Sequence, residues 1–145
     1  MILSKVQRFK YIKLKFQSLE DWTEGQDLLH CNSLFHDRPR FDCVVVNDDS
    51  PGMSVARLLD LFRCWLPSGT VLDLALICGF AKSKCKPRTV WDGCRVLDED
   101  GDSSLILVDY LVRGALMCPV GDRMGERTHY VVDTIDGDMF LRANY

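Results

Sequence analysis

Long apolar runs, paired cysteines and catalytic signatures are all missing from this sequence of 145 residues. No apolar run approaches the roughly 20 residues needed to span a bilayer. Lys and Arg interrupt residues 1–16 too often for a signal peptide. There is no C-x-x-C pair, no G-x-S-x-G, no H-E-x-x-H and no glycine-rich phosphate loop. We therefore expect a protein without a membrane segment, a catalytic residue, a bound metal or a cofactor.

Seven cysteines, an odd number, lie mostly inside apolar runs, where free cysteine behaves as a small hydrophobe. Because no secretion signal is present, this favours free thiols in a reducing compartment over disulfides in a secreted product. The closest grouping of possible metal ligands is His30, Cys31, His36 and Cys43, whose spacing matches no zinc motif. The acidic run 98–102 lacks the downstream Glu of an EF-hand loop.

The composition is that of an ordinary soluble domain, with 47% hydrophobic and 27% charged residues. The length suits one domain with a real core. A net charge of −3 argues against wholesale nucleic-acid binding but permits a local basic patch. Turn signals every ten to fifteen residues predict a mostly β fold, a partly open β-barrel with one or two short helices. We divide the chain into a basic N-terminal strand or arm, 1–16, and a single β-rich domain, 17–145.

The chain is centred on residues 41–81, which hold three apolar runs separated by the turns NDDSPG and PSG. Residues 41–46 predict a strand that is buried on both faces, and residues 70–81 predict a second strand. Residues 53–66 are ambiguous. Their apolar spacing is typical of an amphipathic helix, with Ser54 as a cap and Pro67 as a stop, but they also alternate. The hairpin signal at 67–69 favours a strand, and we predict a three-strand meander.

The flanking segments are expected to hold further strands, loops and a short helix. Residues 12–16 alternate between apolar residues and lysine, as in a half-exposed strand. Ser18 is a possible start of a short helix, and Leu28, Leu29, Leu34 and Phe35 are expected to anchor segment 17–40. We expect a basic loop at 82–88, a short strand within 90–97 and an acidic turn at 98–103. Residues 105–120 are expected to form a strand, a helical turn and another strand, followed by a polar loop at 121–127 and a strand at 130–134.

Two basic patches, 5–15 and 82–88, are the candidate contact surfaces, and Phe80 and Trp91 flank the second. Cations beside an aromatic ring can contact the nucleic-acid backbone and stack a base, although solvated loops also carry such charges. The candidate contact residues are Lys10, Lys13, Lys15, Lys82, Lys84, Lys86, Arg88 and Trp91. A second set of aromatic residues is expected either to form a cage for a methylated lysine or to serve packing. That set is Trp65, Trp91, Tyr110 and Tyr130.

Residues 29–46, LHCNSLFHDRPRFDCVVV, resemble a segment near the C-terminus of transposase-like proteins of mushroom-forming fungi. Further similar segments are 56–62, 106–119 around VRGAL, 131–133 and 136–142. The resemblance covers roughly residues 20–145, and no segment matches a catalytic transposase core. It implies the accessory part of such a protein, either standing alone or as the remnant of a longer element.

A second resemblance concerns the fold. Residues 55–62, the hairpin that follows and residues 74–80 resemble the central strand pair of bromo-adjacent homology domains, and residues 107–119 are similar to their strand–turn–strand return. Those domains are barrel-like and read histone tails or other chromatin partners, so the resemblance implies a barrel and a chromatin partner. The aromatic cage of the methyl-lysine-reading members has no residue-by-residue match here, and that activity is not carried over.

These observations lead to a non-catalytic interaction module, chromatin- or protein-binding, of a transposon-derived protein in the nucleus. The alternative is a DNA-binding accessory domain that uses the patches 5–15 and 82–88. The expected partners are a protein, chromatin or DNA, and not a membrane. A thiol or metal enzyme is the third hypothesis.

Overall fold

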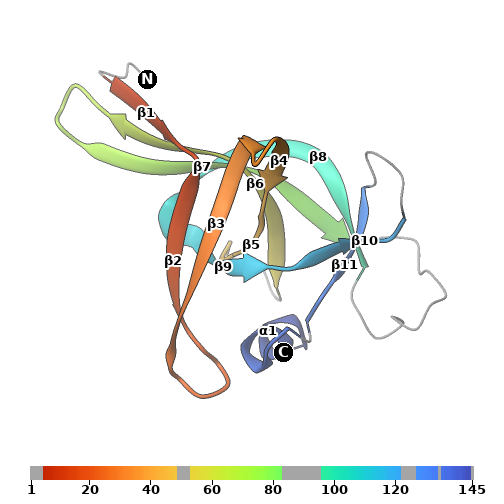
Figure 1. Ribbon diagram of the computed structural model, residues 1–145. Helices are drawn as coiled ribbons and strands as arrows, with labels where there is room; N and C mark the ends of the chain where they lie inside the picture. Colours follow the sequence, from red (N-terminus) through yellow and green to blue (C-terminus); the bar gives the residue numbers. More distant parts are fainter. Residues whose placement is uncertain (1–4, 49–52, 83–95, 122–126, 134, 145) are drawn as a thin grey trace.

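The computed structural model describes residues 5–48, 53–82, 96–121, 127–133 and 135–144 (Figure 1). Most of these residues form β-strands, and a short helix follows the last strand. The expected mostly β, partly open barrel is therefore confirmed. In chain order the elements are β1 Lys5–Phe9, β2 Tyr11–Gln17, β3 Glu24–Phe35, β4 Arg38–Phe41, β5 Cys43–Val46, β6 Ser54–Trp65, β7 Val71–Lys82, β8 Val96–Leu107, the 3₁₀ turn η1 Val108–Tyr110, β9 Leu111–Ala115, β10 Met117–Pro119, β11 Thr128–Val131 and α1 Gly137–Asn144.

The larger sheet nearly closes into a barrel. Its strand order is β10-β11-β8-β7-β6-β5-β9, and β1 pairs with β6 off this path. Only Leu116 separates β9 from β10, so both ends of the path belong to one continuous segment. The Val132 amide, just after β11, donates a hydrogen bond of 2.9 Å to the carbonyl of Leu116. The seam of the barrel therefore lies along the segment 111–119.

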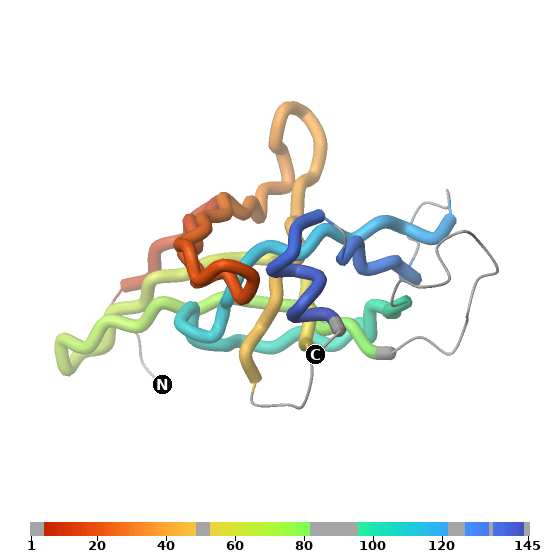
Figure 2. Tube along the Cα trace, turned by 90° about the horizontal axis from the view of Figure 1, so that it is seen from below, coloured from red at the N-terminus to blue at the C-terminus, as the bar shows by residue number. Residues whose placement is uncertain are grey.

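Two bent segments connect the larger sheet to the three-stranded sheet β2-β3-β4. β1 pairs with β6 and β2 with β3, although only Lys10 separates β1 from β2. In the same way β4 pairs with β3, and β5, one residue later, pairs with β6. Strand pairing can therefore be followed from β6 through β1–β2, β3 and β4–β5 back to β6. Figure 2 shows β2 and β3 lying over one side of β6 and β7.

Residues 53–66, the segment with helical periodicity, form the strand β6, as the turn at 67–69 predicted. β6 pairs with β7 along one edge and with β1 and β5 along the other. The β6–β7 hairpin is closed by hydrogen bonds from the Leu66 amide to Thr70 and from the Gly69 amide to Leu66. A β-bulge between Leu58 and Asp60 shifts the register. Pairing along both edges satisfies more backbone groups than an isolated surface helix of this length would, which outweighs the local helical preference.

The core lies on both faces of β5. Its largest cluster joins Leu14 and Leu29 of the three-stranded sheet to Val44, Leu58 and other residues of the larger sheet. The remaining members are Cys31, Val46, Ala56, Leu61, Ala75, Ile77 and Leu111. Val45, on the opposite face of β5, packs with Val131 and with Met139 of α1. All four residues of β5 are buried, so the prediction of a strand buried on both faces is confirmed for this segment.

A buried ion-pair network connects α1 and the β2–β3 hairpin to β9. The Arg113 guanidinium donates hydrogen bonds to Asp136 and to Asp138, the latter at 2.8 Å, and lies 3.7 Å from Asp27. It also stacks on the Phe16 ring, 4.5 Å from the ring centroid. Removing one partner from a buried pair leaves an uncompensated charge, which costs about 3–5 kcal/mol. Arg113 therefore links segments that are distant in the sequence.

The short helix expected from Ser18 is not formed. Residues 18–21 form a turn, and β3 runs from Glu24 to Phe35. Strand pairing across β2–β3, from Tyr11↔His30 to Gln17↔Glu24, overrides the weak local cap signal. Among the expected anchors, Leu29 is buried, whereas Leu28 is exposed and Leu34 is 74% exposed. The anchoring prediction was therefore right for Leu29 and wrong for Leu28 and Leu34.

The acidic run 98–103 is not a turn but the middle of β8. Gly101, at φ 80°, adopts a left-handed conformation that suits glycine, and the register of β7–β8 shifts between Cys78 and Phe80. A bulge of this kind lets the strand continue through residues that otherwise favour a turn. Arg127 donates a hydrogen bond to the Glu99 carbonyl, and the Thr128 hydroxyl donates one to the Asp98 carboxylate. These two bonds hold this part of β8 in place.

Most of the remaining predictions agree with the described elements. Residues 105–120 divide into the end of β8, η1, β9 and β10, as expected, and β7 corresponds to the strand predicted at 70–81. The strand predicted at 130–134 was misplaced: β11 begins at Thr128 and ends at Val131, and Val132 and Asp133 are not in a strand. The predicted loop 82–88 and the predicted strand within 90–97 lie largely outside the described residues, as do parts of the turn 47–52 and the loop 121–127.

Candidate functional site

The predicted contact residues are only partly among the described residues. Lys13 and Lys15 are exposed on β2, and Lys10 is exposed where β1 turns into β2. Lys82 ends β7. The other predicted contacts, Lys84, Lys86, Arg88 and Trp91, lie outside the described residues. The basic patch 5–15 is thus a surface feature of two strands, and the patch 82–88 stays a prediction.

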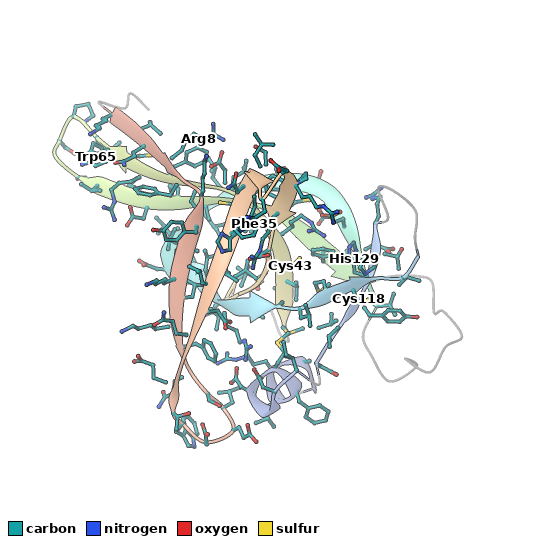
Figure 3. All side chains as sticks on the ribbon, viewed as in Figure 1. Arg8, Phe35, Cys43, Trp65, Cys118 and His129 are labelled. Carbon is teal, nitrogen blue, oxygen red and sulfur yellow. The ribbon has the colours of Figure 1, made fainter. Side chains whose placement is uncertain are left out.

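The described members of the aromatic set, Trp65, Tyr110 and Tyr130, do not gather into a cage, and Trp91 lies outside the described residues. Trp65 lies near the tip of the β6–β7 hairpin, whereas β11, which holds Tyr130 beside His129, is on the other side of the molecule (Figure 3). Tyr130 is buried, and Tyr110 is exposed in η1. Phe80 packs edge-on against His129, with 5.4 Å between the ring centroids. The Phe80 ring therefore packs against a residue of β11.

The four residues considered as metal ligands are separated by their packing. Cys31 and Cys43 are buried, and burial raises the pKa of each thiol to about 11. His30 and His36 instead flank the Phe35 ring, at 4.6 and 4.4 Å between ring centroids. Across the described part of the chain, no three His, Cys, Asp or Glu side chains are placed to hold a metal ion.

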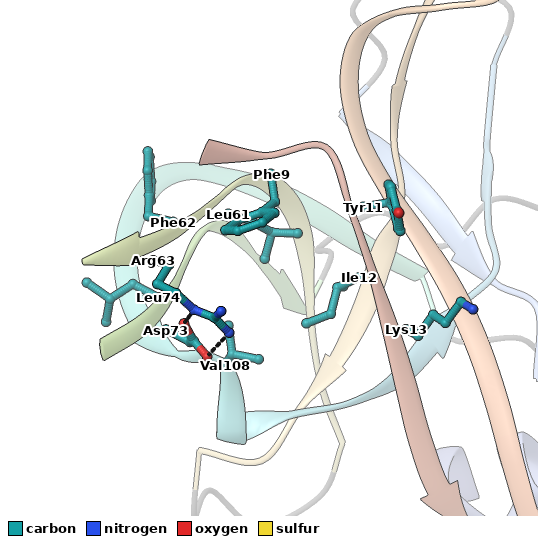
Figure 4. Close-up of a pocket in the computed structure, with 10 residues that line it drawn as sticks. All are labelled: Phe9, Tyr11, Ile12, Lys13, Leu61, Phe62, Arg63, Asp73, Leu74 and Val108. Carbon is teal, nitrogen blue, oxygen red and sulfur yellow. Dashed lines mark hydrogen bonds and ion pairs between the residues drawn. The ribbon is translucent and has the colours of Figure 1, made fainter. Parts of the chain in front are cut away.

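An apolar groove of about 260 Å³ opens where the chain turns from β1, which pairs with β6, into β2, which leads away from the β6–β7 hairpin (Figure 4). Phe9 pairs across the strands with Leu61, and these two side chains line one part of the groove. Ile12 and Val108 line the other part and pack against the main core cluster. The groove is therefore a place where the barrel core reaches the surface. The other lining residues are Tyr11, Lys13, Phe62, Arg63, Asp73 and Leu74.

Charged groups line the groove beside its apolar wall. Arg63 and Asp73 face each other across β6 and β7 and form two hydrogen bonds, of 2.8 and 3.1 Å. The hydrogen bond from Arg63 lowers the pKa of Asp73, so this carboxylate is ionised at neutral pH. Lys13 adds a second positive charge, which leaves a positive excess among the lining residues. Such an exposed ion pair contributes little to stability and can rearrange around a ligand.

Sequence reasoning predicted Lys13 but missed the apolar part of the groove. Phe9, Leu61 and Val108 come from three separate segments. Judged from its sequence neighbours alone, each one is typical of an ordinary core residue. The one local signal is Phe9, an aromatic residue between the cationic residues Arg8 and Lys10.

Comparison of the chain with protein-family models, with curated proteins and with solved structures finds no match. Within the described residues, no helix combines the length and the apolar character that a membrane crossing requires.

Proposed function

We propose that this protein is a non-catalytic interaction module that binds a protein partner through the apolar groove. The observation that supports the proposal is a wall of core side chains open to solvent beside charged groups. About 150 Å³ is enough for a cavity to hold a benzene ring. A groove of about 260 Å³ therefore has room for one large apolar side chain of a partner.

The charges restrict the class of partner. Lys13 and Arg63 outnumber Asp73 along the groove. A segment that carries Asp or Glu next to a Leu, Met or Phe anchor is therefore complementary to it, and a strongly basic tail is not. The resemblances to transposase-associated segments and to bromo-adjacent homology domains favour a chromatin protein as the source of this segment.

The proposal is tested by selecting peptides from a displayed random library on the folded protein and measuring affinities by fluorescence anisotropy. We expect apolar anchors flanked by acidic residues. Phe9→Ser removes one wall of the groove, and Phe9 is not a fully buried residue. The substitution should weaken peptide binding about tenfold, the loss typical of removing one aromatic contact. Leu34→Ser is the matched control, because Leu34 is exposed on the β3–β4 hairpin and does not line the groove.

Two results would contradict the proposal. One is a library that yields no peptide whose affinity depends on Phe9. The other is an equal loss of affinity for Phe9→Ser and Leu34→Ser. The chromatin part is tested separately with nuclear extract, from which the folded protein should retain a chromatin protein that carries an apolar anchor flanked by acidic residues. A selected groove peptide should displace that protein.

A further inference from the structure

The outer face of the sheet β2-β3-β4 brings aromatic rings and cations together. Cross-strand pairing places Tyr11 opposite His30 and Phe35 opposite Arg38. Leu14, between the lysines of β2, points into the core, so the lysines on either side of it point outwards. We refer to this surface, formed by Tyr11, Lys13, Lys15, His30, Phe35, His36, Arg38 and Arg40, as the ring-and-cation face.

The rings form a continuous row. The ring centroids of Tyr11 and His30 are 6.3 Å apart, and those of His30 and Phe35 are 4.6 Å apart. His36 stands edge-on to Phe35 at 4.4 Å. Tyr11, at one end of the row, is 59% exposed. His36, at the other end, is exposed as well, and His30 and Phe35 between them are half-buried. The row therefore presents ring surface to solvent at both of its ends.

The cations surround this row and exceed the acids. Arg40 lies over the Phe35 ring, 4.8 Å from its centroid, and donates a hydrogen bond of 3.1 Å to Asp42. Lys15 is 3.6 Å from Glu24, an ion pair in which both side chains are 68% exposed. Lys13 and Arg38 form no ion pair with any described residue. On the outward side of the sheet the cations are Lys13, Lys15, Arg38 and Arg40, against the acids Glu24, Asp37 and Asp42. The other acids of segment 10–42 lie elsewhere: Glu20 and Asp21 follow β2, and Asp27 lies beside Arg113 of β9.

We propose that the ring-and-cation face binds single-stranded nucleic acid. Exposed rings can stack on unpaired bases, and neighbouring lysines and arginines can contact the phosphates between them. A duplex does not expose its base faces, so the row of rings favours a single strand over a duplex. The Asp42 carboxylate accepts hydrogen bonds from the His30 amide and from the Arg40 guanidinium. It therefore positions Arg40 over the Phe35 ring in the absence of a ligand.

This inference goes beyond the protein-binding function proposed above and does not depend on it. The groove and the ring-and-cation face share Tyr11 and Lys13, but Phe9 lines only the groove, and Phe35 lies only on the face. Substitutions at Phe9 and Phe35 therefore separate the two proposals. The inference also differs from binding through the whole patch 5–15, because it assigns no role to Lys5, whose ammonium lies over Trp65 on β6.

The experiment measures fluorescence anisotropy with labelled oligomers of about 15 nucleotides, close to the largest site size of small single-strand-binding domains. The probes are oligo-dT, oligo-U and a duplex of the same length, and the first two distinguish DNA from RNA. We expect the better single strand to bind at least about tenfold more tightly than the duplex. With three or four phosphate contacts, the slope of log affinity against log salt should be about −2 to −3.

Matched variants assign the binding to the face. Phe35→Ser should weaken single-strand binding about tenfold, while Phe9→Ser leaves it unchanged. The double variant Lys15→Gln/Arg38→Gln should make the salt slope shallower by about one, whereas Lys5→Gln leaves it unchanged. Circular dichroism checks that each variant is folded. The proposal is overturned by duplex binding as tight as single-strand binding, by equal effects of Phe35→Ser and Phe9→Ser, or by no detectable binding at low salt.

Discussion

At the scale of single residues, one stack shows how a side chain can fix the position of a strand. Phe16 lies opposite Gly25 across β2 and β3, and any Cβ at Gly25 would overlap the Phe16 ring. The Arg113 guanidinium also packs on this ring. A glycine on β3 is therefore required by an arginine on β9, because the ring between them needs the space that a side chain would fill.

The cysteines allow a prediction at the same scale. Burial raises the pKa of Cys31 and Cys43 to about 11, and it also raises the pKa of Cys78. Only about one in 10⁴ thiols with a pKa near 11 is ionised at neutral pH. Cys118 is exposed. Because the thiolate is the nucleophile, iodoacetamide should alkylate Cys118 in the native protein at least about tenfold faster than Cys31 or Cys43.

Mass spectrometry of the digested protein after timed alkylation measures each rate separately. In denaturant, all of these cysteines should react at similar rates, which is the control. Alkylation of Cys43 as fast as that of Cys118 under native conditions would contradict the prediction.

At the scale of elements, the helix α1 depends on an ionised carboxylate. Burial opposes ionisation of Asp138, but the hydrogen bonds that it accepts from Arg142, from the Leu19 amide and from Arg113 outweigh that effect and lower its pKa. The pKa of Asp136 is also lowered, because its bonds from Arg113 and the Met139 amide outweigh burial. The side chains of Met139 and Ala143, both fully buried, are thereby held against the barrel.

The resulting prediction concerns acid stability. An unfolded Asp has a pKa of about 3.9, and the folded values are lower. The stabilisation is therefore fully present above about pH 4 and is lost as the pH falls through and below that value. Asp138→Asn should cost about 3–5 kcal/mol at neutral pH because it breaks a buried pair. The free energy of unfolding of this variant should also decrease less than that of the wild type as the pH falls below 4.

Urea unfolding at a series of pH values measures both effects. Asp109→Asn is the matched control, because Asp109 is exposed in η1 and forms no ion pair with any described residue. The same decrease with acid in the wild type and in Asp138→Asn would show that this network does not set the acid limit. If Asp138→Asn does not fold, Arg142→Met provides the comparison, because it removes one donor and keeps the carboxylate.

The elements also show which features local sequence can predict. The turn at 67–69 correctly indicated that β6 and β7 form a hairpin, because turn chemistry is local. The break of residues 105–120 at η1 was local as well. By contrast, the bulge at Gly101 depends on β7, and β3 depends on pairing with β2. Of the groove and the ring-and-cation face, the sequence could indicate only lysines such as Lys13 and Lys15. The apolar residues of the groove, and the rings of the face, come together only after the sheets have formed.

At the scale of the whole molecule, the two sheets should unfold as one unit. The segments β1–β2 and β4–β5 each pair in both sheets, and Leu14, Leu29, Val44 and Leu58 share one core cluster. Opening either sheet therefore exposes part of the core cluster that both sheets share. Native-state hydrogen exchange is therefore expected to give the same free energy of opening for amides in the centres of β3 and β7.

The measurement follows single amides by NMR across low denaturant concentrations. Matching free energies and matching denaturant dependence would support cooperative unfolding. A lower free energy for β3 than for β7, with a smaller denaturant dependence, would mean that the three-stranded sheet opens on its own.

The path of pairing from β6 through β1–β2, β3 and β4–β5 has a consequence for biosynthesis. All of its strands lie between Lys5 and Trp65, so it can close while later residues are still inside the ribosome. The larger barrel needs β11, which ends at Val131. The order of translation therefore favours completing the three-stranded sheet first, as a template on which β7, β8 and the seam segment are added as they emerge.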